Sequence, residues 1–284
     1  MPPIIVVAAH FCLGYHQGSN KRRRLSLGFW KIKMLPQFIE LTSIIFIFAP
    51  LLAAYLTSGS PAQGTILVRQ IVLEVALIGV FIGAVAMLGA LNDVDALGPA
   101  TAILLLFVVY GFLIFGIISV IPASNSEIHS ASLARRIIAV FLFLLTLGLV
   151  IAQGAGLPGY LYPEALVYVV SSMAVLGIVR RSMGKSDIVQ TIVSRLPHIG
   201  LYGLFLSLIP VLWGITDPRS IGPALAFGYL SFLYAGITSV GYKLANPSIA
   251  NEIKPIGWPF VCWTLVVLVT SGMLILASSQ LSTN

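Results

Sequence analysis

Charged residues are scarce in this 284-residue chain, at 9% of the total, whereas 58% of the residues are hydrophobic. The mean hydropathy of +1.01 is higher than a water-exposed surface can carry. This shortage of charge argues against a soluble enzyme or a soluble binding domain. It predicts an all-α, polytopic integral membrane protein that contacts the lipid bilayer along most of its length.

Cysteine and histidine are also rare, with 2 and 4 residues. Cys12 and Cys262 cannot form the several bridges of a secreted disulfide-rich domain, and the histidines show no metal-ligand spacing. We therefore expect no metal site, no cofactor and no catalytic residues.

Eight apolar runs are long enough to cross a bilayer, which takes about 20 residues of helix. They cover residues 37–57, 70–91, 97–121, 136–153, 162–179, 197–215, 221–242 and 257–278. Because backbone in lipid must satisfy its own hydrogen bonds, these runs predict helices and not strands. The short connections between them argue against an extramembrane domain.

Basic residues of the connections gather on one side of the predicted bundle. Nine of them follow the odd-numbered runs, among them Arg69 and Lys243, whereas the other connections carry only Arg219. The positive-inside rule places the nine-residue side in the cytoplasm and both termini outside.

The N-terminal tail conflicts with that orientation, because residues 1–33 contain six basic residues and no acidic one. Residues 34–284 have 10 basic and 9 acidic residues, so the net charge of +7 belongs to the tail and does not indicate a nucleic-acid partner. We expect translation to begin at Met34. Two alternatives remain open, namely a first apolar run that re-enters or lies on the membrane surface, and a cleaved signal peptide.

An internal repeat relates residues 79–112 to residues 203–236 at an offset of 124. Nine pairs are identical, and most of them surround an Asp-x4-Gly-Pro-Ala core: Asp93, Gly98 and Pro99 correspond to Asp217, Gly222 and Pro223, and Tyr110 corresponds to Tyr234. The offset predicts a first repeat at 34–157 and a second at 158–284, each with four helices in the same membrane orientation.

Local chemistry explains parts of this core. Asp93 and Asp217 are placed to cap the helix that follows, and Pro99 and Pro223 are expected in its first turn, where a missing N–H is harmless. Gly79 and Gly83 form a small-residue face that permits close helix contact. Generic packing explains each glycine alone, but not the appearance of the whole pattern twice.

Two ionisable residues occupy corresponding positions in the repeats, since Glu74 plus the offset of 124 gives His198. Ionisable groups inside a membrane are functional candidates, and these two could pair or relay a proton if the repeats face each other. The alternative is that Glu74, about one turn into its helix, reaches the membrane interface and pairs with Arg69.

The hairpin motif resembles the third and fourth transmembrane helices of flagellar stator A-subunits, the MotA/PomA group of the MotA/TolQ/ExbB proton channel family. The residues that carry the resemblance are VAML at 85–88, Asp93, LGPATA at 97–102, Tyr110-Gly111, and Pro197-x2-Gly200-x2-Gly203. The resemblance implies an oligomeric ring in the bacterial inner membrane around a single-span, MotB/ExbD-like partner, whose membrane aspartate carries ions.

The sequence also departs from that family. The family's threonine pair falls on Phe107 and Val108 in the first copy and on Ser231 and Phe232 in the second, and the large cytoplasmic segment is missing. Thr101 and Ser231 are the hydroxyls that remain near the implied ion path, with Pro197, Glu74 and His198 as further candidates.

We therefore expect an integral membrane subunit of the stator or energy-transducer type that acts with a single-span partner. A secondary transporter built from parallel repeats is the alternative, and an aqueous cavity lined by Glu74 and His198 would favour it. A non-conducting membrane scaffold is the third reading.

Overall fold

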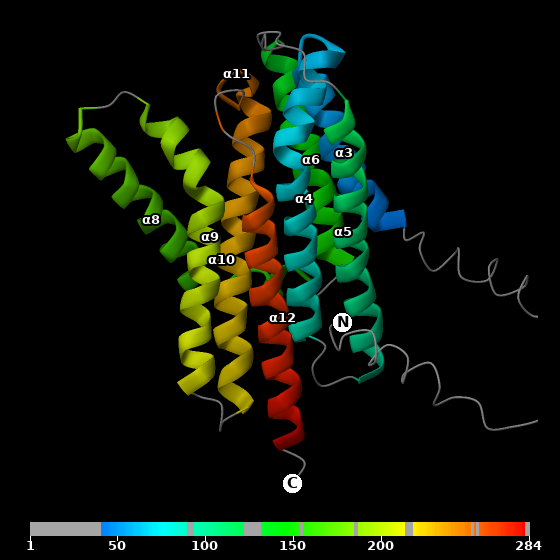
Figure 1. The fold of residues 1–284 in the computed structure, drawn as a ribbon, viewed down its shortest axis with the longest axis vertical. Coiled ribbons are helices and arrows are strands. Elements are labelled where there is room, and N and C mark those ends of the chain that lie inside the picture. The colour runs from blue at the N-terminus through cyan, green and yellow to red at the C-terminus, as the bar shows by residue number, and fades with distance from the viewer. Residues whose placement is uncertain are drawn as a thin grey trace, which may run out of the picture. The chain divides into compact units, whose positions relative to one another are not determined.

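A computed structural model describes residues 41–89, 94–121, 132–153, 156–184, 187–213, 218–250, 253 and 256–281 of the chain (Figure 1). Residues 40–284 form one compact unit. The expected tail at 1–33 and the expected start at Met34 lie outside the described residues.

Helices make up nearly all of the described chain, which confirms the all-α prediction. The long ones are α3 Leu41–Thr57, α4 Pro61–Gly89, α5 Val94–Val120, α6 Leu133–Gln153, α8 Pro163–Ser182, α9 Ile188–Trp213, α10 Pro218–Ala245 and α12 Trp258–Leu281, and two short helices are α7 Gly156–Gly159 and α11 Pro247–Ala250. Each predicted apolar run falls on one long helix.

Six of these helices, α4, α5, α6, α8, α9 and α10, are long and apolar enough to cross a membrane. The apolar helix Leu41–Thr57 and the apolar stretch Pro259–Gly272 of α12 are shorter. The chain is thus a multi-pass membrane protein with six such helices among the described residues, where eight runs had been predicted.

Several helices extend beyond the apolar runs that predicted them. α4 begins at Pro61 and not at residue 70, and α9 begins at Ile188 and not at residue 197. Hydropathy marks the part of a helix that lies in lipid, but backbone hydrogen bonding continues through polar residues. Arg69 and Lys243, which were expected in connections, therefore belong to α4 and α10.

The prolines of the repeated core are also placed differently from the prediction. α5 begins at Val94 and α10 at Pro218, so Pro99 and Pro223 are each the sixth residue of a helix and lie in its second turn. A proline there removes one helical hydrogen bond. Asp93 and Asp217 lie outside the described residues.

The centre of the bundle is formed by α4 and α10. α4 packs against α3, α5 and α10, and α10 packs against α4, α8 and α9. The most apolar window of α4 is 83% buried, whereas that of α8 is only 11% buried. Figure 1 shows α8 at the outer edge of the bundle, inclined to α9.

Candidate functional site

Glu74 lies at the centre of a buried ionic cluster. It is the fourteenth of the 29 residues of α4, and its side chain is only 2% exposed. The Lys243 ammonium pairs with Glu74 Oε1, and the Ser239 hydroxyl donates a hydrogen bond of 2.9 Å to Oε2. Lys243 is likewise 2% exposed, so a full ion pair is enclosed within the protein.

This finding corrects the expected partner of Glu74. The carboxylate does not pair with Arg69, which donates a hydrogen bond of 2.9 Å to the carbonyl oxygen of Ser119. Its partner is Lys243, which is far away in the sequence. Glu74 follows the predicted start of the apolar run at residue 70 by four positions, and α4 itself continues back to Pro61.

The helix geometry of α10 explains how the cluster forms. Ser239 and Lys243 are four residues apart, so they lie on the same face of α10, and that face packs against α4. Lys243 was not predicted as a site residue, because it follows directly after an apolar run and was therefore expected in a connection. Its spacing of four from Ser239 fits a shared helix face, but no sequence feature pointed to Glu74 as its partner.

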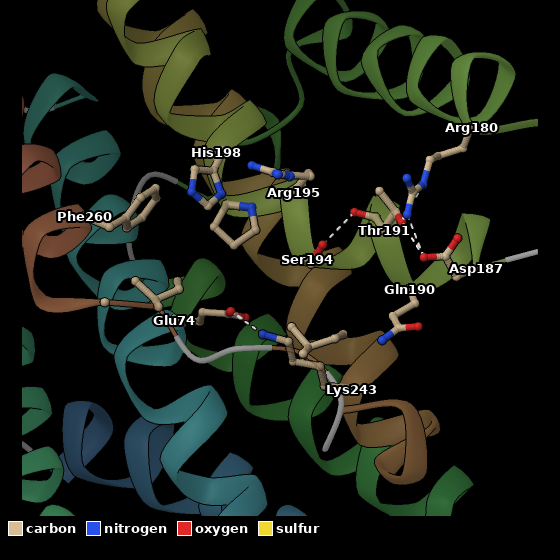
Figure 2. A pocket seen from close by; sticks show the side chains of 14 residues that line it. Glu74, Arg180, Asp187, Gln190, Thr191, Ser194, Arg195, His198, Lys243 and Phe260 are labelled. Carbon is tan, nitrogen blue, oxygen red and sulfur yellow. Dashed lines mark hydrogen bonds and ion pairs between the residues drawn. The ribbon is translucent and has the colours of Figure 1, made fainter. Parts of the chain in front are cut away.

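The ion pair lines a cavity of about 520 Å³ (Figure 2). Five helices and two connections contribute to its wall: Glu74 from α4, Arg180 from α8, Gln190, Thr191, Ser194, Arg195, Pro197 and His198 from α9, Lys243 from α10 and Phe260 from α12, with Asp187 just before α9 and Ile253, Ile256 and Gly257 before α12. The contributing parts of α8, α9, α10 and α12 are those next to the connections predicted to face the cytoplasm.

The described lining of the cavity carries an excess of positive charge. A second ion pair, Arg180 with Asp187, joins atoms 2.6 Å apart, and the Arg180 Nε–H also donates a hydrogen bond of 3.0 Å to the Thr191 hydroxyl. Among the described residues, five charged side chains line the cavity; the two pairs neutralise four of them, and the fifth is Arg195. With His198 neutral, these described residues have one net positive charge.

The structure brings Glu74, His198 and Pro197 together in this one cavity. His198 comes from α9 and faces the ring of Phe260 with 5.1 Å between ring centroids. The repeat offset, which made Glu74 and His198 corresponding residues, had already singled out both. Their meeting depends on how α4 and α9 are placed around α10.

The other candidates for an ion path lie elsewhere. Thr101 is partly buried on α5, with its hydroxyl 3.9 Å from the sulfur of Met87. Ser231 is fully buried on α10 and donates a hydrogen bond of 2.7 Å to the carbonyl oxygen of Phe227, one turn earlier. Neither residue lines the cavity.

The two tyrosines of the repeated motif are partly buried. The Tyr234 hydroxyl donates a hydrogen bond of 2.6 Å to the Tyr160 carbonyl and accepts one of 3.0 Å from the Tyr162 N–H. Tyr110 is partly buried on α5. Gly98 and Pro99 belong to α5, and Gly222 and Pro223 belong to α10.

Comparisons with known proteins identify no relative of this chain. No family model matches the chain, and no curated protein and no solved structure matches it. Functional inference therefore depends on the cavity and on the sequence pattern.

Proposed function

We propose that this chain is a secondary transporter built from two parallel four-helix repeats, with the cavity around Glu74 and Lys243 as its solute site. The observation that carries the proposal is a fully buried ion pair that lines a cavity of about 520 Å³ in a membrane protein. Buried ion pairs are weak stabilisers, because desolvation offsets most of their attraction. Charges retained inside a membrane are more often part of a solute or proton pathway.

Helix bounds support the duplication. α4 ends at Gly89 and α9 at Trp213, and α5 begins at Val94 and α10 at Pro218, so both differences equal the sequence offset of 124. In the described residues, α4 and α5 thus have counterparts in α9 and α10 at the offset of the sequence repeat.

Close helix contacts within the two hairpins support it further. A Cβ placed on Gly79 would lie 2.5 Å from the Phe107 ring, and one on Gly203 would lie 2.6 Å from Ser231 Cβ, at the corresponding position. Gly83 approaches Leu104, and the counterpart of that pair is Ser207 with Gly228. The glycine of this contact is on α4 in the first hairpin and on α10 in the second, and the helices are in close contact in both.

The position of the cavity fits a transporter of this type. Glu74 belongs to the first repeat, whereas Lys243 and His198 belong to the second, so the site lies between the copies. Solute sites of transporters with internal repeats are usually found there. A polar cavity lined by Glu74 and His198 is also the feature that favours a transporter over a transducer subunit or a non-conducting scaffold.

The ion pair suggests how an anion would bind. An anion at the Lys243 ammonium competes with the Glu74 carboxylate for the same charge. We infer that the solute anion displaces the Glu74 carboxylate from Lys243, and that the ion pair closes again when the anion leaves.

A second candidate is the transducer subunit that acts with a single-span partner. It is favoured by one observation besides the sequence resemblance, an exposed apolar stripe on α5 formed by Leu105, Val109, Leu113 and Ile117, each more than half exposed. These residues are spaced four apart and present one face, which a partner helix in the membrane could cover.

Transport by the purified protein in proteoliposomes would test the first candidate. We expect either electrical currents with soluble anions such as acetate, benzoate and phosphate, or leaflet transfer of a fluorescent lipid with an anionic headgroup. The double variant Glu74→Met/Lys243→Met removes both charges together and should fold but not transport. Glu164→Gln, at an exposed position on α8, is the matched control.

Two results together would overturn the transporter in favour of the transducer. The first is the absence of both activities in protein that is folded by size-exclusion chromatography. The second is a single-span protein with a membrane aspartate, identified by mass spectrometry after purification in mild detergent.

A further inference from the structure

A second cavity, of about 710 Å³, lies between α8 and α9. Its wall is mainly apolar along α8, with Val175, Leu176 and Val179, and is completed by Ile199 and Tyr202 of α9. The remaining lining residues are Tyr168, Ser171, Ser172, Met183, Arg180, Thr191, Arg195 and His198. We call this second cavity the α8–α9 groove.

The groove adjoins the polar cavity. Arg180, Thr191, Arg195 and His198 line both spaces, so the cationic residues stand where the two meet. The combined space has a polar compartment at the Glu74–Lys243 pair and an apolar compartment along α8. A ligand that fills both must be amphipathic.

The groove opens at the surface of the bundle, because several of its lining side chains are exposed, among them Val175, Met183 and Tyr202. α8 beside it is the least buried of the membrane helices described, at 11% of its most apolar window, and we expect lipid along it. From Met183 back to Tyr168 the groove follows 15 residues of helix, or about 22 Å. That distance exceeds half of the roughly 30 Å hydrocarbon core, so it accommodates the acyl chain of one leaflet.

The far end of the groove is closed by a tyrosine. The Tyr168 hydroxyl donates a hydrogen bond of 3.1 Å to the Ile199 carbonyl and so joins α8 to α9. The ring of Tyr168 also packs against Phe227 of α10, with 5.6 Å between centroids. The groove therefore ends inside the membrane, and its basic end lies at the surface predicted to face the cytoplasm.

We propose that the ligand of this site is an anionic phospholipid, with its phosphate in the polar cavity and an acyl chain in the α8–α9 groove. The proposal rests on the proposed function and names its substrate class. Arg195, the charge beyond the two ion pairs, meets the phosphate, and Arg180 stands beside it. A basic pocket between membrane helices on the cytoplasmic side is suited to anionic headgroups.

Native mass spectrometry of the purified full-length chain tests the headgroup. The protein is titrated with dioleoyl phosphatidylglycerol and, separately, with dioleoyl phosphatidylcholine. We expect preferential binding of phosphatidylglycerol, and we expect Arg195→Gln to reduce that preference at least fivefold. Arg181→Gln is the matched control, because Arg181 is an exposed arginine on α8 that lines neither cavity.

A second pair of variants tests the acyl chain. Val175→Trp fills the groove and should reduce phosphatidylglycerol binding at least fivefold, whereas Ile178→Trp, 69% exposed and outside the groove, should leave it unchanged. Equal binding of the two lipids, or equal effects of the two tryptophans, would overturn the proposal. Displacement of the lipid by soluble glycerol phosphate at the same concentration would assign the site to a free anion instead.

The outcomes separate this inference from the proposed function. Selective lipid binding without transport in proteoliposomes would retain the lipid site and reject the transporter. Transport of soluble anions without selective lipid binding would retain the transporter and reject the lipid.

Discussion

The α4–α5 and α9–α10 hairpins both have close helix contacts, but they differ in the residues at those contacts and in their polar residues. A Cβ on Gly111 of α5 would lie 2.3 Å from Ala76 of α4. At the offset of 124 this pair corresponds to Gly200 of α9 and Ala235 of α10, so the glycine is on the other helix. A Cβ on Gly200 would lie 2.8 Å from the Cα of Phe232, one turn from Ala235, so α9 and α10 also approach closely there. Identical residues alone therefore understate the similarity of the hairpins.

The two hairpins differ more in the polar residues that line the cavity than in their helix contacts. Where α4 has Glu74, bound by two residues of α10, α9 has His198, which faces an aromatic ring. The hairpins therefore differ at the site, while both keep close helix contacts at small residues.

The largest effect is expected from breaking the Glu74–Lys243 pair on one side only. Glu74→Gln leaves a buried ammonium without its carboxylate, which should lower the free energy of unfolding by roughly 3–5 kcal/mol. Thermal unfolding followed by fluorescence-detected size-exclusion chromatography measures the loss. The double variant Glu74→Met/Lys243→Met should recover most of it, and a double variant as unstable as the single one would show that the pair is not the cause.

A smaller effect is expected at the helix crossing. Gly111→Ala should destabilise the α4–α5 hairpin by about 1–3 kcal/mol, because the new methyl group overlaps Ala76. Adding Ala76→Gly transfers the glycine to α4, as in the other hairpin, and should restore stability. Gly116→Ala, in open space on the same helix, is the control, and the same thermal assay applies.

Failure of that rescue would contradict the equivalence of the two crossings. If Gly111→Ala with Ala76→Gly unfolds as early as Gly111→Ala alone, the two hairpins do not tolerate the same exchange of glycine between their helices.

Next in size is the loss of the Tyr234 hydroxyl. Tyr234→Phe removes a hydrogen bond to the Tyr160 carbonyl and another from the Tyr162 N–H, at a cost of about 1–2 kcal/mol. Tyr202→Phe, 60% exposed on α9, provides the comparison in the same melting experiment. Equal melting temperatures for the two variants would show that these hydrogen bonds contribute nothing.

The smallest effect is expected at Ser231. Its hydroxyl is bonded to the backbone of its own helix, so Ser231→Ala should cost less than about 1 kcal/mol and leave transport unchanged. Flux in proteoliposomes checks this, measured beside Thr238→Ala, an exposed residue of α10 whose hydroxyl also donates a hydrogen bond to the carbonyl one turn earlier. A loss of flux in Ser231→Ala alone would return this serine to an ion path and favour the stator-like reading.

Much of the architecture could be predicted from hydropathy, because a helix in lipid must be apolar. Each predicted run falls on a helix, but hydropathy stopped at residue 70 where α4 continues to Pro61, since polar residues extend a helix outside the hydrocarbon. For the same reason hydropathy did not predict Lys243 as a buried residue: it lies near the end of α10, where a charged residue is expected in a connection. Its burial depends on the packing of α4 against that end, and no single segment encodes that contact.

The segment between α7 and α8 holds the two hairpins together through Tyr160 and Tyr162. Tyr160 donates a hydrogen bond to the Ile82 carbonyl of α4, while its own carbonyl and the Tyr162 N–H are bound to Tyr234 of α10. The connection thus braces the two hairpins against sliding, because such motion would break three hydrogen bonds of largely buried groups. In the described part of the chain, α8 packs mainly against α9 and α10. For the proposed transport, we therefore expect α8 to move relative to the two hairpins, which would keep their positions against each other.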